Sequence, residues 1–352
     1  MIVDRRFPFL PIALLLALTT LGCSHRASFE TALDGSPPPV VEEAWIAPFE
    51  LADNVDSVAI APEHGWVLAT TKETHQLLVI DAGSGRLVRR VGAPGARLGQ
   101  FDRPNGVAVI DDLALVVERD NHRVQVLSLP ELEPLGLVGA EILQRPYGIA
   151  AHSEDGAVTL WVTDNFKIAG DDPAGDPRLA GRVKVFRLTR DADGISSEHL
   201  RSFGETTGRG ALWKVETIAV DTANDVLLIA EEHDDRMALL VYSTAGEFTG
   251  RSVGGDVFAA EPEGLSLWRD GDDGIWVATD QYARRSVFHL FDRRTFAHLG
   301  AFTGAVTANT DGIAVTDRPV DGFEKGVVVA VHDDQAVTAF DWRNVAATLP
   351  HE

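Results

Sequence analysis

The chain has 352 residues, 45% of them hydrophobic and 24% charged, a composition that excludes a disordered, collagenous or coiled-coil protein. Its 31 Lys and Arg against 53 Asp and Glu give a formal net charge of −22, so we expect no nucleic-acid partner, which would need a basic face. The single cysteine excludes an intrachain disulfide and a cysteine-based zinc site.

The first 22 residues are typical of an export signal. Arg5 and Arg6 form a short basic region, and the apolar run over residues 7–21 has the length of a signal core. That run is too short to span a bilayer comfortably. We therefore expect the chain to be exported and residues 1–22 to be removed.

The segment Thr20-Leu21-Gly22-Cys23 resembles the lipobox of bacterial lipoproteins, in which the cysteine becomes the lipidated N-terminus. The resemblance implies lipidation of Cys23 and a membrane partner bound through that lipid. Ser24 gives no signal for retention in the inner membrane, which implies an outer-membrane lipoprotein facing the periplasm or the cell surface. An ordinary secretory signal followed by an incidental cysteine is the alternative.

Residues 23–44 are rich in Ser and Pro, with three consecutive prolines at 37–39. Such a composition favours an extended chain without a core of its own. We expect this segment to be a tether that holds the folded domain, residues 45–352, away from a membrane.

The rest of the chain repeats one pattern six times. Each copy begins with a polar residue and an alternating apolar run, followed by a turn, a second β run, a polar cluster and a third β run. No convincing helix interrupts the copies. Six β units of about 45 residues each predict an all-β fold, a six-bladed β-propeller of four-stranded antiparallel blades. The residues that open the six copies are Asp56, Asn105, Tyr147, Glu216, Glu263 and Asp311.

Propeller geometry predicts which of the aligned residues lie on the same face of the ring. The first strand of each blade lines the central channel and the second runs back beside it, so the start of the first strand and the end of the second share a face. The six opening residues then form a ring at the channel mouth, and four of them are carboxylates. The residues just past the second strands form a wider ring: Lys72-Glu73, Glu118-Arg119, Asp164-Asn165, Glu231-Glu232, Asp280-Gln281 and Asp333-Asp334.

Converging carboxylates repel one another, and a hard cation relieves that repulsion. Oxygen donors without a cysteine or a histidine triad favour calcium over zinc or copper. Acidic residues at strand ends are also commonly solvated or cap turns, so a structural role is the alternative for any one of them. Because four carboxylates recur at one register position, we predict calcium at the channel mouth.

Over residues 45–348 the chain resembles the β-propeller phytase family. The order and spacing of the matching stretches carry the resemblance more than any single motif does. The stretches are residues 181–202, 216–221 leading to 228–232, 261–265, the Asp280-Gln281 step, Thr310-Asp311-Gly312-Ile313 and the closing 341–346.

The resemblance implies a calcium-dependent phosphatase acting on phytate or a related inositol phosphate. In that family several calcium ions turn the acidic mouth into a phosphate-binding surface and activate the attacking water. It implies that Lys72 and Arg119 hold the oxygens of a small phosphorylated substrate and that Tyr147 lines the cleft. The calcium ligands that it implies are Asp56, Glu216, Glu232, Glu261, Glu263, Gln281 and Asp311.

The chain departs from the family in the loop before its last Thr-Asp-Gly, where residues 303–309 contain no acid. Three alternatives therefore remain open: the chain binds fewer calcium ions, acts on another phosphate ester, or has no hydrolytic activity. A second possibility is a calcium-dependent lactonase or esterase resembling the gluconolactonases, with Asn105, Glu216 and Asp311 as ligands. A third is a non-catalytic lipoprotein that binds a ligand or protein. A closed propeller has no free sheet edge that demands a partner, so we expect a monomer.

Residues 99–109 together with 120–126 resemble one NHL repeat. In that repeat the turn and an arginine brace neighbouring strands. The resemblance implies an architectural role for this stretch and supports a six-bladed propeller.

Overall fold

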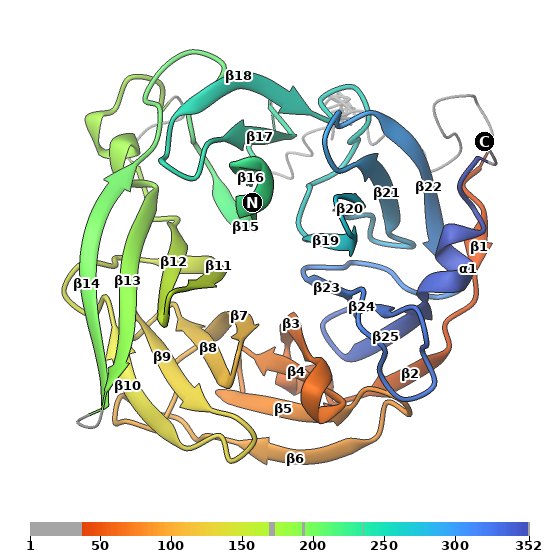
Figure 1. Ribbon diagram of the computed structural model, residues 1–352, viewed down its shortest axis with the longest axis horizontal. Helices are drawn as coiled ribbons and strands as arrows, with labels where there is room; N and C mark the ends of the chain where they lie inside the picture. Colours follow the sequence, from red (N-terminus) through yellow and green to blue (C-terminus); the bar gives the residue numbers. More distant parts are fainter. Residues whose placement is uncertain (1–36, 169–172, 192–193, 235, 351–352) are drawn as a thin grey trace, which may run out of the picture.

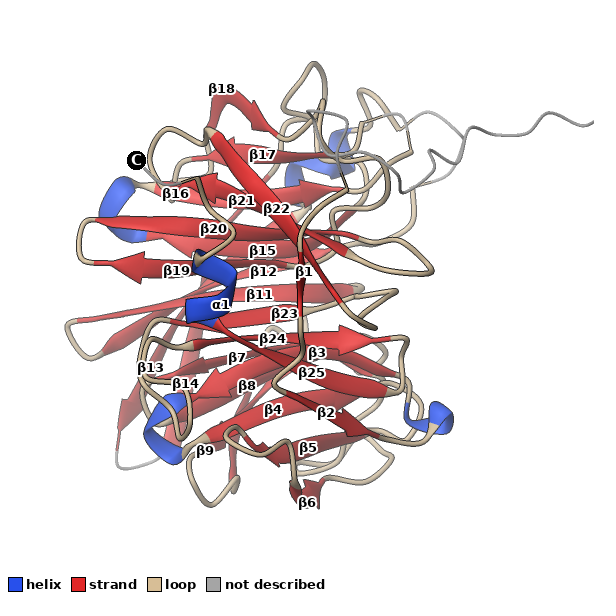
Figure 2. Cartoon of the chain, turned by 90° about the vertical axis from the view of Figure 1, so that its right-hand side faces the viewer, coloured by secondary structure: helices blue, strands red, loops and turns tan. Residues whose placement is uncertain are grey.

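The computed structural model describes residues 37–168, 173–191, 194–234 and 236–350. They form six blades of four antiparallel strands around a central channel, which confirms the predicted six-bladed β-propeller (Figure 1). Seen from the side, the strands run between two faces of the ring, and loops join them at both faces (Figure 2). The predicted signal peptide and Cys23 lie outside the described residues.

The strands of each blade follow one another in sequence from the channel outwards, except in the last blade. The blades consist of β3 (Val55–Ala61), β4 (Trp66–Thr71), β5 (Gln76–Asp81) and β6 (Leu87–Val91); β7 (Pro104–Ile110), β8 (Leu113–Glu118), β9 (Arg123–Ser128) and β10 (Pro134–Val138); β11 (Pro146–Glu154), β12 (Ala157–Asp164), β13 (Val183–Asp191) and β14 (Gly194–Phe203); β15 (Val215–Asp221), β16 (Val226–Glu231), β17 (Ala238–Tyr242) and β18 (Phe248–Val253); β19 (Leu265–Asp270), β20 (Asp273–Asp280), β21 (Val287–Asp292) and β22 (His298–Gly304); and β23 (Ile313–Thr316), β24 (Val327–His332), β25 (Ala336–Asp341) and β2 (Trp45–Pro48).

The core is divided into six clusters, each between two neighbouring blades. Successive residues of a strand point to opposite faces of its sheet, so each inner strand supplies two clusters at once. In β8, Leu115 and Val117 pack toward the third blade, whereas Ala114 and Val116 pack toward the first. This is why the second strands read as uninterrupted apolar runs rather than as an alternation.

The N-terminal segment closes the ring. β2 pairs with β25 and supplies the outer strand of the last blade, and β1 (Val40–Val41) pairs in parallel with β22. Between them, the Glu43 carboxylate accepts hydrogen bonds from the backbone N–H groups of Ala305, Val306 and Thr307 at 2.9–3.1 Å. β1 and Glu43 belong to the fold although they lie within the segment predicted as a tether.

Helix contributes little to the described chain. A single α-helix, α1 (Trp342–Ala346), follows β25, beginning where the Asp341 side chain accepts a hydrogen bond from the Arg343 N–H. Short 3-10 turns occur at Leu51–Asp53, Pro62–His64, Pro177–Gly181 and Thr222–Asn224. Among the described residues, no helix is both long and apolar enough to cross a membrane.

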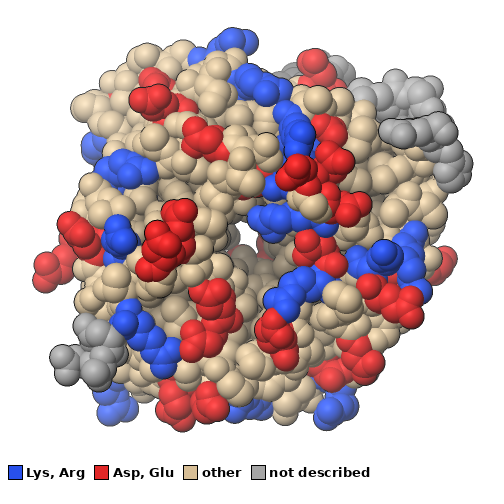
Figure 3. Space-filling model, in the orientation of Figure 1, with Lys and Arg blue, Asp and Glu red and all other residues tan. Residues whose placement is uncertain are grey.

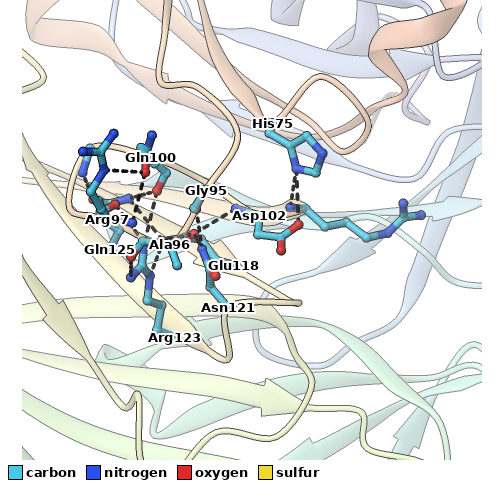
Figure 4. A network of polar contacts seen from close by, with 12 residues as sticks. His75, Gly95, Ala96, Arg97, Gln100, Asp102, Glu118, Asn121, Arg123 and Gln125 are labelled. Carbon is cyan, nitrogen blue, oxygen red and sulfur yellow. Dashed lines mark hydrogen bonds and ion pairs between the residues drawn. The ribbon is translucent and has the colours of Figure 1, made fainter.

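The stretch that resembles an NHL repeat forms a buried polar network in the second blade (Figure 4). The Arg123 Nε lies 2.7 Å from Glu118 Oε1, and Arg123 Nη1 donates to the Ala96 carbonyl at 2.7 Å. Gln125 donates to the same Glu118 oxygen and accepts from the Gly99 N–H. Because these groups join the loop over residues 95–100 to β8 and β9, the network holds in place the connection that leads from the first blade into the second.

We expect Arg123→Met to lower the free energy of unfolding by about 3 kcal/mol, because it leaves the buried Glu118 carboxylate without its cationic partner. Urea denaturation at pH 7 measures this loss. Arg86→Met removes an equal charge from the exposed turn between β5 and β6 and is the matched control. Equal stabilities for the two variants would contradict the bracing role.

Candidate functional site

The six residues predicted to open the blades lie together around one mouth of the channel. In the first four blades the pairing with the second strand shifts register across this residue, for example between Val55 and Val58 and between Val215 and Ile218. Such a bulge re-aims side chains and bends the strand. It allows Asp56 and Glu216 to face the channel mouth while the preceding Val55 and Val215 enter the core.

Neighbouring blades approach each other closely at this ring. A Cβ at Gly106 would lie 2.3 Å from the Tyr147 carbonyl oxygen, and one at Gly148 would lie 2.1 Å from that of Glu216. Only glycine fits at these two positions, because the main chain of the next blade occupies the space of a side chain. The glycine after the ring residue thus keeps the ring narrow enough for side chains of different blades to touch.

The wider ring has two alternating roles. In four blades the last residue of the second strand is an acid that accepts backbone N–H bonds from the incoming loop; these are Glu118, Asp164, Glu231 and Asp280. The next residue carries its side chain into the mouth. Lys72, Asn165 and Gln281 contact a ring residue, and Glu232 has a carboxylate oxygen within 4.8 Å of two ring carboxylates. Successive side chains of an extended chain point to opposite sides, so the acid binds the loop while the next residue faces the mouth.

Asp56 is held by donors of the protein itself. Its fully buried carboxylate lies 2.6 Å from Lys72 Nζ, and it accepts hydrogen bonds from the Tyr147 hydroxyl at 3.3 Å and from Asn105 Nδ2 at 3.2 Å. The neighbouring Asp311 accepts from Gln281 Nε2 at 2.6 Å. On this side of the mouth the carboxylates already have hydrogen-bonding partners.

The glutamates on the other side are far less satisfied. Glu216, Glu232 and Glu263 each offer a carboxylate oxygen within 4.8 Å of the other two. Glu216 accepts from Asn165 Nδ2 at 2.9 Å, whereas neither oxygen of the fully buried Glu232 has a hydrogen-bond partner. A buried carboxylate without donors is costly, so this cluster, which we call the glutamate cluster, lacks the hydrogen-bond donors that would stabilise the charge of Glu232.

Burial raises the pKa of the acids around the mouth. Burial and the charges of Glu263 and Glu216 raise the pKa of Glu232 well above its ordinary value, and burial beside Glu216 does the same to the pKa of Glu263. Burial also raises the pKa of Glu216. Burial, with Asp56 nearby, raises the pKa of Asp311 to about 8. Without a cation, these groups retain protons at a pH where free carboxyls have lost theirs.

Lys214 adds to the predicted residues of the mouth, and Asp334 of the predicted wider ring also reaches it. Lys214 Nζ lies 2.9 Å from Glu261 Oε1 and 3.6 Å from Glu232 Oε2, and Asp334 lies against Asp311 and raises its pKa. Lys214 has a signal in the sequence, because a polar residue stands two positions before each ring residue. These residues are Asn54, Arg103, Arg145, Lys214, Glu261 and Asn309.

Lys72 and Arg119, predicted to hold phosphate, and Tyr147, predicted to line the cleft, lie at this mouth, and each forms an ion pair or a hydrogen bond. Lys72 Nζ contacts Asp56 and lies 4.0 Å from Asp311 Oδ2. Arg119 donates to both oxygens of Asp120, at 2.8 and 3.1 Å, with 19% of its side chain exposed. Tyr147, which belongs to the ring at the mouth, donates a hydrogen bond from its hydroxyl to Asp56. Lys72 and Tyr147 therefore share the Asp56 carboxylate, whereas Arg119 pairs with Asp120.

The channel itself is open toward the opposite face. A cavity of about 800 Å³ extends from that second mouth, lined by residues such as Arg269 and Arg318, up to Asp311. Figure 3 looks onto this second mouth, where basic and acidic side chains alternate around the opening. Arg318 forms an ion pair there with Glu63.

Comparison with known proteins shows the fold alone. No protein-family model matches the chain. No curated protein matches it either. Among solved structures, a chain in the crystal structure of a nidogen/laminin complex is similar, with a TM-score of 0.51 and 16% sequence identity, covering 79% of this chain and 89% of that one.

Proposed function

We propose that the channel mouth binds a divalent cation, calcium first among the candidates, and hydrolyses a phosphoric monoester such as phytate or a related inositol phosphate. The observation that carries this proposal is the glutamate cluster, in which the buried Glu232 carboxylate has no hydrogen-bond donor. The resemblance of the sequence to the β-propeller phytases supplies the substrate class.

The donor set fits a hard cation. Glu216, Glu232 and Glu263 provide up to six carboxylate oxygens, the ligand type and number that calcium takes, and no histidine or cysteine lies among them. Asp56 and Asp311 already have protein donors, so the glutamate cluster is the better supported of the two sides. A bound cation of this kind would polarise a phosphoryl oxygen and lower the pKa of a water.

The chain's own cations would position the substrate. Lys72 and Arg119 flank the mouth, and Arg119 presents a planar fork that matches two phosphate oxygens. Both are now paired with carboxylates, so a phosphate group would have to compete with Asp56 and Asp120 for them. The Tyr147 hydroxyl adds a neutral donor beside Asp56.

A calcium-dependent lactonase or esterase is the second candidate. It is favoured by Asn105, whose side-chain oxygen is buried and has no hydrogen-bond partner. Together with Glu216 and Asp311 it would give a ligand set of one amide and two carboxylates at the mouth. This set shares Glu216 with the glutamate cluster but adds Asn105 and Asp311, so the substrates separate the two candidates.

The test is phosphate release from phytate by a soluble form beginning at residue 24, with calcium and with chelator. We expect release only with calcium, and its loss in the Glu216→Gln, Asp311→Asn double variant but not in Glu63→Gln, at the opposite mouth. Calcium-induced stabilisation without phosphate release would direct the search to lactones. Neither stabilisation nor turnover of phosphate esters or lactones would leave a non-catalytic binding lipoprotein.

We further propose that the chain acts as an exported monomer anchored in the outer membrane by a lipid at Cys23. The sequence before residue 24 supports the export and the lipid, and β2 and β1 leave the ring closed, which supports the monomer. Replacing Cys23 by Ser should release the protein from the membrane fraction, and retention there would contradict the anchor.

A further inference from the structure

Lys214 brings an ammonium group into the glutamate cluster. It precedes Glu216 by two residues, next to the register shift of β15, and its Nζ lies 2.9 Å from Glu261 Oε1. The Glu232 oxygen at 3.6 Å is beyond hydrogen-bond range, and the Lys214 side chain is 36% exposed. The ammonium therefore approaches the buried Glu232 from the solvent side without donating to it.

Lys72 offers a contrast within the same mouth. It contacts Asp56 at 2.6 Å, and Asp56 also accepts from Tyr147 and Asn105, so the lysine is one member of a completed set of donors. Around Lys214 the set is incomplete, because both oxygens of Glu232 lack a donor. One ammonium there faces four carboxylates, those of Glu216, Glu232, Glu261 and Glu263.

We propose that Lys214 is a tethered counter-cation that competes with a divalent ion for Glu232 and Glu261 and so lowers the affinity of the glutamate cluster for metal. The proposal rests on the proposed function in one respect, that the cluster binds a cation. Two positive charges near the same carboxylates repel each other, so the Lys214 ammonium has to move away from them when the ion binds. Lys214 would thereby set the metal concentration at which the site fills.

Removing this competitor has a defined consequence. Lys214→Met keeps the length of the side chain and removes its charge, so the cluster should bind calcium more tightly. For a partly exposed ion pair we expect an effect of about tenfold in Kd, equivalent to about 1.4 kcal/mol. The metal-free variant should also be less stable than the wild-type chain, because the carboxylates then repel one another without compensation.

The experiment is isothermal titration of calcium into the metal-free soluble chain, wild-type and variant. Lys325→Met removes the same charge from an exposed position in the loop before β24 and is the matched control. Tighter binding in Lys214→Met with unchanged binding in Lys325→Met supports the proposal. Lys214→Gln, which keeps a donor toward Glu261, replaces the methionine variant if that one does not fold and should also bind more tightly than wild type.

The outcomes separate this inference from the proposed function. Unchanged or weaker calcium binding in both Lys214 variants, with binding in the wild type, would overturn the competition and leave the metal site standing. Binding in the Lys214 variants alone would support the competition in its strongest form. No binding in any chain would overturn both the metal site and the role of Lys214. The readout is affinity, so it does not depend on turnover.

Discussion

Glu232→Gln is expected to raise the melting temperature of the metal-free protein and to abolish most of its stabilisation by calcium. The wild-type carboxyl is fully buried, accepts no hydrogen bond and lies among other acids that raise its pKa. The amide is neutral, so the variant loses the repulsion within the glutamate cluster. We expect a gain on the order of 5 °C in chelator, measured by calorimetry, since about 2 kcal/mol shifts a chain of this size by that amount.

The neighbouring Glu231 provides a matched control. Its carboxylate is equally buried but accepts backbone N–H bonds from Trp213, Lys214 and His233. Glu231→Gln should therefore lower the melting temperature and keep the response to calcium. If both variants lose stability in chelator and both retain the calcium response, Glu232 is a structural residue and the glutamate cluster is not a metal site.

The fold was predictable because the repeat is strong in the sequence. Six copies with a polar opening residue and three β runs admit few architectures besides a six-bladed propeller. The ring was predictable for the same reason, since equivalent positions in a propeller lie at equivalent places around the channel. The grouping of Asp56, Glu216, Glu263 and Asp311 at one mouth follows from register alone.

The division of that ring into a satisfied and an unsatisfied side was not predictable. It depends on which donors reach the ring residues: Asn165 and Gln281 reach across to Glu216 and Asp311 of the next blade, whereas Lys72 contacts Asp56 of its own blade. Sequence distance says nothing about such contacts between blades. Lys214 was missed because the repeats were aligned from the ring residue onward. The closure of the last blade by β2 was hidden in the same way, since that strand lies almost 300 residues from β25.

Raised pKa values at the mouth predict an inverted pH dependence of stability in the metal-free protein. Asp311, with a pKa of about 8, and the three glutamates of the cluster keep protons in the folded state that the unfolded chain releases near pH 4. Between about pH 4.5 and 8 the folded state therefore binds more protons than the unfolded one. Stability contributed by these groups is complete below pH 4 and is lost as the pH rises through their folded pKa values.

Other acids have lowered pKa values and therefore stabilise the folded state more as the pH rises, but only at a lower pH. Arg90 lowers the pKa of Asp53, and hydrogen bonds from Thr307 and its neighbours help to lower the pKa of Glu43, so their stabilisation is lost only as the pH falls below about 4.5. We expect the melting temperature in chelator to fall by on the order of 10 °C from pH 5 to pH 8. Saturating calcium should flatten this slope, because the ion replaces the protons, and Asp311→Asn should reduce it in chelator. A melting temperature that rises from pH 5 to pH 8 in chelator would mean that the mouth carboxyls ionise freely in the folded protein and need no cation.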